Sequence, residues 1–341
     1  MSNLVRITDV SPRDGLQNES GVIATVDKVR LIDLLCAAGV DEIEITSFVS
    51  PKWVPQLADS ADVVRAVLGT SPESGVKVRP ALSVLVPNEK GRASLYALEL
   101  EIRDAHLQRA VKHGINATDH ARFMNWLDKP LIDTISVFTA ASETFSQRNT
   151  NATIDQTIDR FKDLIAQDAS VHTVRGYVSC AIACPFEGPI APRRVARVVE
   201  QLIEIGIREI DLGDTIGAAD VASVTHLLLT IRDVVPPSWF ESHRVTLHLH
   251  DTFGRAADCV TAALGLGVVS FDGSVAGLGG CPYASTPSRR APGNIDTGLL
   301  VSTIHKAGFL TNVDLDRLEV AAEFARTTVA KSRASQPGAA S

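Results

Sequence analysis

The run Val245-Thr246-Leu247-His248-Leu249-His250-Asp251 is the stretch around which the chain is organised. It has the apolar character of a buried strand, and alternate side chains of a strand share one face, so His248 and His250 point the same way. Two imidazoles about 7 Å apart along a strand can bind one cation. The pair alone is a weak signal, because two hydrogen-bonded core histidines give the same pattern. A metal site therefore needs further ligands from elsewhere in the chain.

Length and composition restrict the class of protein. The chain has 341 residues, of which 45% are hydrophobic and 21% charged, and its net charge is −7. This size fits one large α/β barrel or two ordinary domains. The negative charge argues against nucleic acid or an anionic membrane as the main partner. No apolar run approaches the roughly 18 residues of a membrane span.

Two features indicate a cytoplasmic protein. A strand-like run, Leu4–Ile7, begins so early that we expect no signal or transit peptide before it. The five cysteines are an odd number, so we expect reduced thiols rather than a disulfide framework. The spacing Cys180-x₃-Cys184 is compatible with half a zinc site, but the sequence has no second pair, and burial at a strand end is the favoured interpretation.

Short β-branched runs alternate with amphipathic segments along the whole chain. The expected strands are Leu4–Asp9, Asp41–Phe48, Val76–Val84, Ile132–Phe138, Val174–Ser179, Glu209–Leu212, Val245–His250 and Val269–Ser274. The expected helices are Val26–Ala38, Leu57–Leu68, Ile154–Ala166, Pro192–Ile205, Ala219–Val234, Ala256–Leu266 and Thr297–Ala307. This alternation predicts an α/β fold of the closed (β/α)₈ type, a TIM barrel. A doubly wound open sheet is the alternative, but the segment Ser11–Leu16 after the first strand lacks the glycine fingerprint of that fold.

Two segments extend the barrel, which we expect to span residues 1–310. An insertion of about residues 89–131 follows the third strand, and its part Leu95–His113 has a helical period. We favour an extended crossover packed on the barrel exterior, with a lid or an oligomer contact as the alternative. Residues 311–332 form a C-terminal helical extension, with Leu315–Lys331 as the helix, and residues 333–341 form a tail that we expect to be disordered.

Polar residues gather where the predicted strands end, which is the catalytic face of this fold. These ends carry Asp9–Glu19, Glu42–Ser47, Asp211–Thr215, His248–Asp251, and Val275–Tyr283 with Gly293-Asn294. A carboxylate, two imidazoles and an amide oxygen would suit Mg²⁺ or Mn²⁺, and Zn²⁺ or Co²⁺ could also occupy such a site. Arg13 beside Asp14 would bring a permanent cation next to that metal, useful for a developing oxyanion, unless the two form an ordinary surface pair.

Several long motifs resemble the 3-hydroxy-3-methylglutaryl-CoA lyase family. They are Pro12–Glu19, Thr46–Gln56, Arg175–Cys180, Gly213–Gly217 and Val275–Tyr283. The similarity covers nearly the whole chain except the region 95–131 and the tail. It implies a TIM barrel that cleaves a tertiary 3-hydroxyacyl-CoA, such as 3-hydroxy-3-methylglutaryl-CoA, to acetyl-CoA and a keto acid (acetoacetate) with a divalent cation. It also implies an enzyme of the oxo-acid lyase class that acts in leucine catabolism.

The resemblance also assigns roles to individual residues. It implies four metal ligands, namely Asp14, His248, His250 and Asn294. It implies that Arg13 stabilises the enolate oxygen and that the Cys281 thiol returns a proton to the departing acetyl group. The base that removes the hydroxyl proton remains open between Asp14 and His248. Residues matching substrate-binding or supporting positions are Arg13, Gln17, Glu44 and Asp214.

Some features leave the substrate open. Asp211 stands where the family usually has a small hydroxyl residue, and an added carboxylate there would repel an acidic acyl group unless it is paired. Ser288-Arg289-Arg290 lies in a long loop and would meet a substrate anion or form a solvated tip. The alternatives are a lyase for citramalyl-CoA or a longer branched analogue, a Claisen-type synthase, or an inactive scaffold. The expected partner is an acyl-CoA, and a homodimer remains open.

Overall fold

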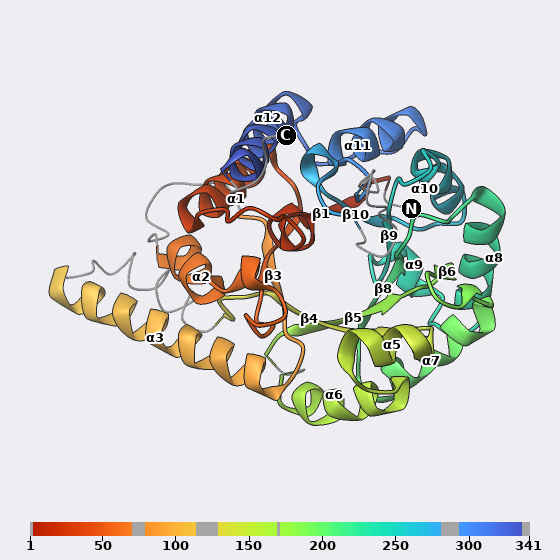
Figure 1. Cartoon of the computed structure of the whole chain (residues 1–341), viewed down its shortest axis with the longest axis horizontal. Helices are drawn as coiled ribbons and strands as arrows, with labels where there is room; N and C mark the ends of the chain where they lie inside the picture. Colours follow the sequence, from red (N-terminus) through yellow and green to blue (C-terminus); the bar gives the residue numbers. More distant parts are fainter. Residues whose placement is uncertain (1–2, 70–78, 114–128, 169–170, 281–292, 336–341) are drawn as a thin grey trace.

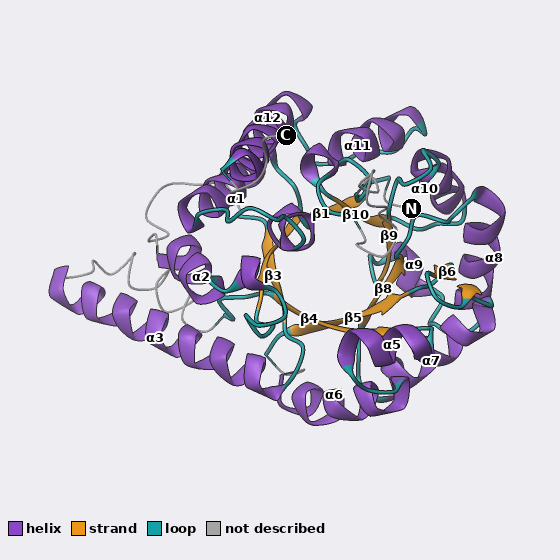
Figure 2. Ribbon diagram, in the orientation of Figure 1, coloured by secondary structure: helices purple, strands orange, loops and turns teal. Residues whose placement is uncertain are grey.

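Eight parallel strands close into a barrel in the computed structural model, which describes residues 3–69, 79–113, 129–168, 171–280 and 293–335. The ring of strands is surrounded by helices (Figures 1 and 2). Around the ring the order is β1-β10-β9-β8-β5-β4-β3-β2. The strands are β1 (Arg6–Asp9), β2 (Glu42–Ser47), β3 (Ala81–Leu85), β4 (Thr134–Ala140), β5 (Thr173–Ser179), β8 (Glu209–Asp214), β9 (Val245–Leu249) and β10 (Ser270–Gly273). The closed barrel confirms the predicted fold and excludes the open sheet.

The helices follow the strands in the expected order. They are α1 (Thr25–Ala38), α2 (Ser60–Gly69), α3 (Glu89–His113), α5 (Glu143–Thr150), α6 (Ile154–Asp168), α7 (Pro192–Glu204), α8 (Val221–Arg232), α9 (Ser238–Glu241), α10 (Ala256–Gly265), α11 (Thr297–Lys306) and α12 (Leu315–Ala334). The short helix α5 and the small hairpin of β6 (Ala183–Cys184) and β7 (Gly188–Pro189) were not expected from the sequence. Among the described helices, none combines the length and apolarity needed to cross a bilayer.

The interior of the barrel is polar, and its side chains meet in two layers. In the first, the fully buried Arg175 donates from Nη2 to Glu42 Oε2 at 2.8 Å and to Glu209 Oε2 at 3.0 Å. The second layer lies two residues further along the strands, because Tyr177 follows Arg175 on the same face of β5. Tyr177 is paired in register with Asp211 on β8. Apolar strand residues such as Ile43 and Val178 belong instead to the core beneath the surrounding helices.

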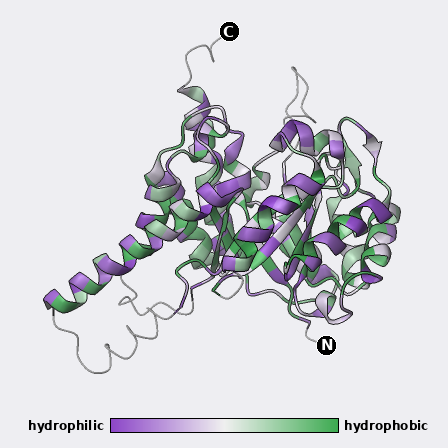
Figure 3. Ribbon diagram, turned by 90° about the horizontal axis from the view of Figure 1, so that it is seen from below, coloured by the Kyte–Doolittle hydropathy of each residue, from purple (hydrophilic) through white to green (hydrophobic). Residues whose placement is uncertain are grey.

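Helix α3 is the crossover that follows β3, and it projects from the barrel wall (Figures 1 and 3). One side of its first half, Leu95, Leu98 and Ile102, is buried, whereas Val111 near its end is 83% exposed. The first half of α3 therefore packs on the barrel exterior, and residues 114–128 of the expected insertion lie outside the described residues. The helix begins at Glu89, six residues before the expected start at Leu95.

A buried charge cluster holds α3 against the barrel. His172 lies 3.5 Å from Glu99 Oε2 on α3 and 3.7 Å from Asp168 Oδ1 at the end of α6. Glu99 also accepts hydrogen bonds from the backbone N–H groups of Leu131 and Ile132, at 3.1 Å each. Although burial opposes the shift, Asp168 and Glu99 raise the pKa of His172 from 6.5 to about 9. The imidazolium therefore joins two helices and the approach to β4.

This cluster predicts a loss of stability at alkaline pH. A folded-state pKa above the unfolded value stabilises the fold fully below pH 6.5, and this contribution is lost as the pH rises towards 9. We expect this contribution to the free energy of unfolding to be about 2 to 3 kcal/mol. Urea unfolding at pH 6.5 and pH 9 would measure it, and His172→Gln should flatten the pH dependence. The exposed His305 offers a matched control, His305→Gln; an equal slope in His172→Gln and wild type would contradict the assignment.

The C-terminal helix α12 packs beside α1 along the barrel wall (Figure 1). It continues to Ala334, two residues past the expected limit of the extension at 332. At its last turn, Arg333 donates to both carboxylate oxygens of Glu19 at 2.9 Å. This ion pair ties the end of the helix to the loop after β1, which explains why residues 333 and 334 are helical rather than part of a tail.

Candidate active site

The four predicted metal ligands come together at the carboxyl ends of β1, β9 and β10. His248 Nε2 lies 4.0 Å from Asp14 Oδ2, and candidate ligand atoms of Asp14, His248 and His250 all lie within 4.8 Å of one another. Asn294 donates from Nδ2 to Asp14 Oδ2 at 2.8 Å and pairs with His250 in an isolated backbone bridge. Residues separated by most of the chain are therefore neighbours.

The donor set fits a hard divalent cation. Asn294 Oδ1 and His250 Nδ1 are buried without a hydrogen-bond partner among the described residues. Arg13 and the two imidazoles lower the pKa of Asp14 to about 2 against the effect of burial, and burial lowers the pKa of His250 to about 4. At neutral pH the carboxylate is therefore ionised and this imidazole neutral, as metal binding requires. Mixed oxygen and nitrogen donors of this kind suit Mg²⁺ or Mn²⁺.

A tight turn after β1 places Arg13 and Asp14 at the site. Residues Ser11–Gly15 form a single π-helical turn, with the Gly15 N–H donating to the Val10 carbonyl at 3.1 Å. Asp9 anchors the turn by accepting hydrogen bonds from the Ser11 N–H at 2.9 Å and the Val275 N–H at 3.1 Å. A Cβ at Gly15 would lie 2.8 Å from Ser274 Oγ, so only glycine lets the turn pack against the end of β10.

Arg13 is held in a fixed orientation beside Asp14. Its guanidinium contacts the Glu44 carboxylate and donates from Nη1 to Asp14 Oδ1 at 2.7 Å. The same group lies 5.5 Å from the centre of the Tyr177 ring. Against the effect of burial, Glu44 and Asp14 raise its pKa further above the usual range of arginine. Arg13 therefore remains a cation despite being 6% exposed, and it is not the ordinary surface pair that the sequence left open.

The other residues implied by the resemblance take different places. Glu44 is fully buried beneath Arg13, so its position favours holding that guanidinium over touching a substrate directly. Gln17 is partly exposed and donates to Asp14 Oδ1 at 2.6 Å. Asp214 accepts from the N–H groups of Ala218 and Ala219, at 3.0 and 2.9 Å, and burial raises its pKa to about 6. Cys281 and Arg289-Arg290 lie outside the described residues.

Two residues of the site were not singled out from the sequence. Asp272 on β10 accepts at Oδ2 from His248 Nδ1, at 3.0 Å. Tyr177 on β5 donates to the same oxygen at 3.4 Å. The sequence contained one signal for Asp272, which is an acidic residue inside the strand Val269–Ser274. An unpaired carboxylate would be costly in this buried strand of apolar and small residues, so a partner could be expected. Its partner depends on register, since Asp272 and His248 stand opposite each other on neighbouring strands.

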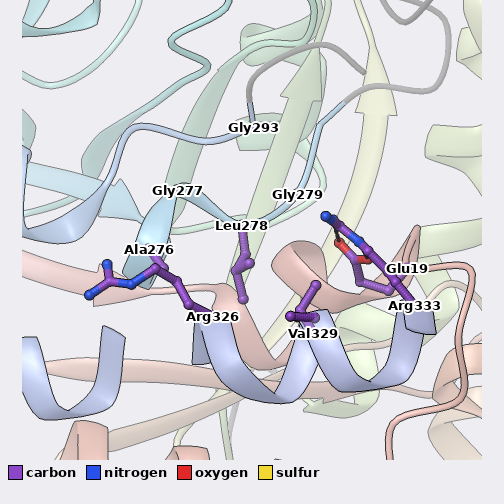
Figure 4. Close-up of a pocket in the computed structure, with 10 residues that line it drawn as sticks. Glu19, Ala276, Gly277, Leu278, Gly279, Gly293, Arg326, Val329 and Arg333 are labelled. Atoms are coloured by element: carbon purple, nitrogen blue, oxygen red, sulfur yellow. Dashed lines mark hydrogen bonds and ion pairs between the residues drawn. The ribbon is translucent and has the colours of Figure 1, made fainter. Parts of the chain in front are cut away.

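A pocket of about 290 Å³ lies between α12 and the glycine-rich segment that follows β10 (Figure 4). The ion pair of Glu19 and Arg333 borders it at one end, and Arg326 borders it at the other. Next to Glu19, Asn18 donates from Nδ2 to the Gly280 carbonyl at 3.2 Å. The chain after Asp14 is thus attached both to α12 and to the glycine-rich segment.

Comparison with known proteins identifies the family. A family model described as HMGL-like matches residues 4–325. A mitochondrial hydroxymethylglutaryl-CoA lyase of Arabidopsis thaliana is 40% identical over 322 residues, which cover 94% of this chain but 58% of that longer protein. The 3-hydroxy-3-isohexenylglutaryl-CoA/hydroxy-methylglutaryl-CoA lyase of Pseudomonas aeruginosa is 38% identical over 336 residues, or 97% of this chain and 95% of that protein.

Solved structures agree with this assignment. An HMG-CoA lyase from Acinetobacter baumannii, in complex with coenzyme A and 3-methylmalate, has a TM-score of 0.75 with this chain at 30% identity. The similarity covers 97% of this chain and 92% of that one. The family model, the curated relatives and the solved structure therefore match almost the same residues of this chain. The chain belongs to the HMGL-like family, whose relatives described above are named as hydroxymethylglutaryl-CoA lyases.

Proposed function

We propose that this protein is a divalent-metal-dependent lyase that cleaves 3-hydroxy-3-methylglutaryl-CoA to acetyl-CoA and acetoacetate. The observation that carries the proposal is the convergence of Asp14, His248, His250 and Asn294 beside a fixed arginine. The named activities of the relatives from Arabidopsis and Pseudomonas support the choice of substrate. The complex of the Acinetobacter lyase with coenzyme A supports an acyl-CoA as the ligand.

The reaction is a retro-aldol cleavage, and it defines what the residues must do. The bond between C2 and C3 breaks after the C3 hydroxyl loses its proton, and the electron pair passes to the thioester enolate. A divalent cation, when bound by the four ligands, supplies a Lewis acid that lowers the pKa of that hydroxyl. Asp14 or His248 would accept the proton. The cation of Arg13 would balance the charge that appears on the enolate oxygen.

Two further groups would keep these residues in place. Glu44 is fully buried and would hold the guanidinium of Arg13, so that little reorganisation is needed when the enolate forms. Asp272 would orient the ring of His248 by accepting from Nδ1, which leaves Nε2 free for the cation. The Cys281 thiol would give a proton to C2 of the enolate and would regain one in place of the proton removed from the C3 hydroxyl, so acetyl-CoA and acetoacetate together contain all the atoms and electrons of the substrate.

A substrate panel would test the proposal. The purified protein should release acetyl-CoA from 3-hydroxy-3-methylglutaryl-CoA when Mg²⁺ or Mn²⁺ is present, and EDTA should abolish release. Adding the ion back should restore acetyl-CoA release, because EDTA removes the cation from its ligands and leaves the protein folded. Unchanged turnover in EDTA, after dialysis that removes the metal, would contradict metal dependence.

A longer branched acyl-CoA is the second candidate, because the Pseudomonas relative is named for the 3-hydroxy-3-isohexenylglutaryl substrate as well. The panel should therefore include that thioester and citramalyl-CoA. The physiological substrate is the one with the highest kcat/KM, since this ratio measures discrimination between competing substrates. Release of acetyl-CoA from none of the three would reject the lyase assignment itself.

The compartment and the assembly follow as further proposals. The thiols of Cys36, Cys184 and Cys259 form no disulfide within the described part of the chain, which fits a reducing cytoplasm. In that compartment the proposed reaction would serve leucine catabolism. Size-exclusion chromatography with light scattering would decide whether the protein is the homodimer left open by the sequence.

A further inference from the structure

Asp9, at the end of β1, is a buried carboxylate on which four hydrogen-bond donors converge. Its Oδ1 accepts from the Ser11 N–H at 2.9 Å and from the Ser11 hydroxyl. Its Oδ2 accepts from the Val275 N–H at 3.1 Å and from the Thr297 hydroxyl at 2.7 Å. All four residues are fully inaccessible to solvent. Asp9 therefore joins three parts of the chain, namely the turn after β1, the glycine-rich segment after β10 and the start of α11.

The glycine-rich segment, residues 275–280, needs such an anchor because its backbone is strained. Ala276 has a φ of 60°, in the left-handed region that costs a residue with a Cβ about 1 to 2 kcal/mol. Conformations of this kind persist only where the surrounding contacts hold them. The hydrogen bond from the Val275 N–H to Asp9 is such a contact, and it lies one residue before the strained position.

The same segment orients the amide of Asn294. Asn294 donates from Nδ2 to the Leu278 carbonyl at 3.1 Å and to Asp14 Oδ2 at 2.8 Å. Because both N–H bonds are used, the amide presents Oδ1, which has no hydrogen-bond partner among the described residues, to a cation. The packing is close, since a Cβ at Gly279 would lie 2.6 Å from Asn294 Nδ2. The orientation of the amide thus depends on where Leu278 is held.

We propose that Asp9 is a positioning residue that fixes Asn294 relative to Asp14. It holds Asp14 through the turn after β1. It holds Asn294 from two sides, through the segment that contains Leu278 and through Thr297, three residues further along the chain. Partners behind the ligands set the geometry of metal sites in this way. The inference rests on the proposed function only in treating Asp14 and Asn294 as metal ligands.

Amide hydrogen exchange in the metal-free protein tests the anchor without metal or substrate, so the inference and the proposed function can fail separately. Asp9→Asn keeps the size of the side chain but has one acceptor oxygen, so two of the four donors lose their acceptor. Exchange in the turn after β1 or in the glycine-rich segment should become faster by about 10-fold or more, whereas exchange in α8 should not change. Equal exchange in wild type and Asp9→Asn would overturn the proposal.

The second test measures Mn²⁺ binding by calorimetry. Asp9→Asn should lower the affinity by about 10-fold or more. Thr297→Val keeps the size of the side chain but removes one donor, so the affinity should fall by about 3- to 10-fold, whereas Thr297→Ser keeps the hydroxyl and should bind within about twofold of wild type. Thr303→Val is the matched control, because the Thr303 hydroxyl donates within α11, to the Leu299 carbonyl at 2.8 Å.

The comparison of variants separates positioning from a general loss of stability. A substitution that only weakens the fold lowers Tm but leaves the Mn²⁺ affinity of the folded protein unchanged, so thermal unfolding is measured on the same samples. Wild-type affinity in either Asp9→Asn or Thr297→Val would overturn the proposal, and so would equal losses in the valine and serine variants. If wild type itself binds no Mn²⁺, the proposed function fails, and hydrogen exchange alone decides the role of Asp9.

Discussion

Replacing His250 by alanine is expected to abolish Mn²⁺ binding and turnover together. The imidazole is buried, and its pKa of about 4 keeps it neutral and ready to bind a cation at neutral pH. The bridge to Asn294 is made by the backbone of residue 250 and stays in the alanine variant, so the substitution tests the imidazole alone. Loss of a partner behind a ligand costs about 10- to 100-fold in affinity, so loss of the ligand itself should exceed about 100-fold.

Calorimetry with Mn²⁺ and an acetyl-CoA release assay would measure both effects on one preparation. His305→Ala is the matched control, because that histidine lies exposed on α11 and its ring hydrogen-bonds only to Thr311 among the described residues. Asp14→Asn should behave like His250→Ala, since it removes the only anionic ligand while keeping the side chain's size. Normal Mn²⁺ affinity in either variant would remove that residue from the metal centre.

The barrel could be predicted from the sequence because its signal is local. Each strand is a short β-branched run, and each is followed by an amphipathic segment, so the alternation alone specifies eight units. The ends of the strands then specify one face of the barrel, which is why Asp14 and Asn294 were expected near the two imidazoles. The limits of the elements were less certain, as the start of α3 at Glu89 illustrates.

The inner layers could not be predicted, since they depend on how the barrel closes. Alternation indicates that Arg175 and Tyr177 share a face, but not that Arg175 meets Glu42. Likewise Asp211 and Asp272 come from strands that are not neighbours in the sheet, and only the stagger of the closed barrel brings their carboxyl groups together. Pairing of this kind is a property of the tertiary structure and leaves no periodic pattern in the sequence.

Arg13→Met should lower kcat by at least about 100-fold while Mn²⁺ still binds. Arg13 contacts the metal ligand Asp14 but is not itself a ligand, and its charge is placed to meet the enolate oxygen. Removing a cation beside the site would leave the attraction between Asp14 and Mn²⁺ unchanged or stronger. Arg65→Met is the control, because Arg65 is an exposed arginine on α2 that pairs only with surface acids.

The single substitution has a second effect that the experiment must separate. It leaves Glu44 fully buried without its cation, and an unpaired buried charge destabilises a fold by about 3 to 5 kcal/mol. The double variant Arg13→Met, Glu44→Gln removes that charge, so it should regain thermal stability but not activity. Recovery of turnover in the double variant would show that Arg13 serves Glu44 and the fold, whereas persistent loss with normal Mn²⁺ binding assigns its charge to the enolate.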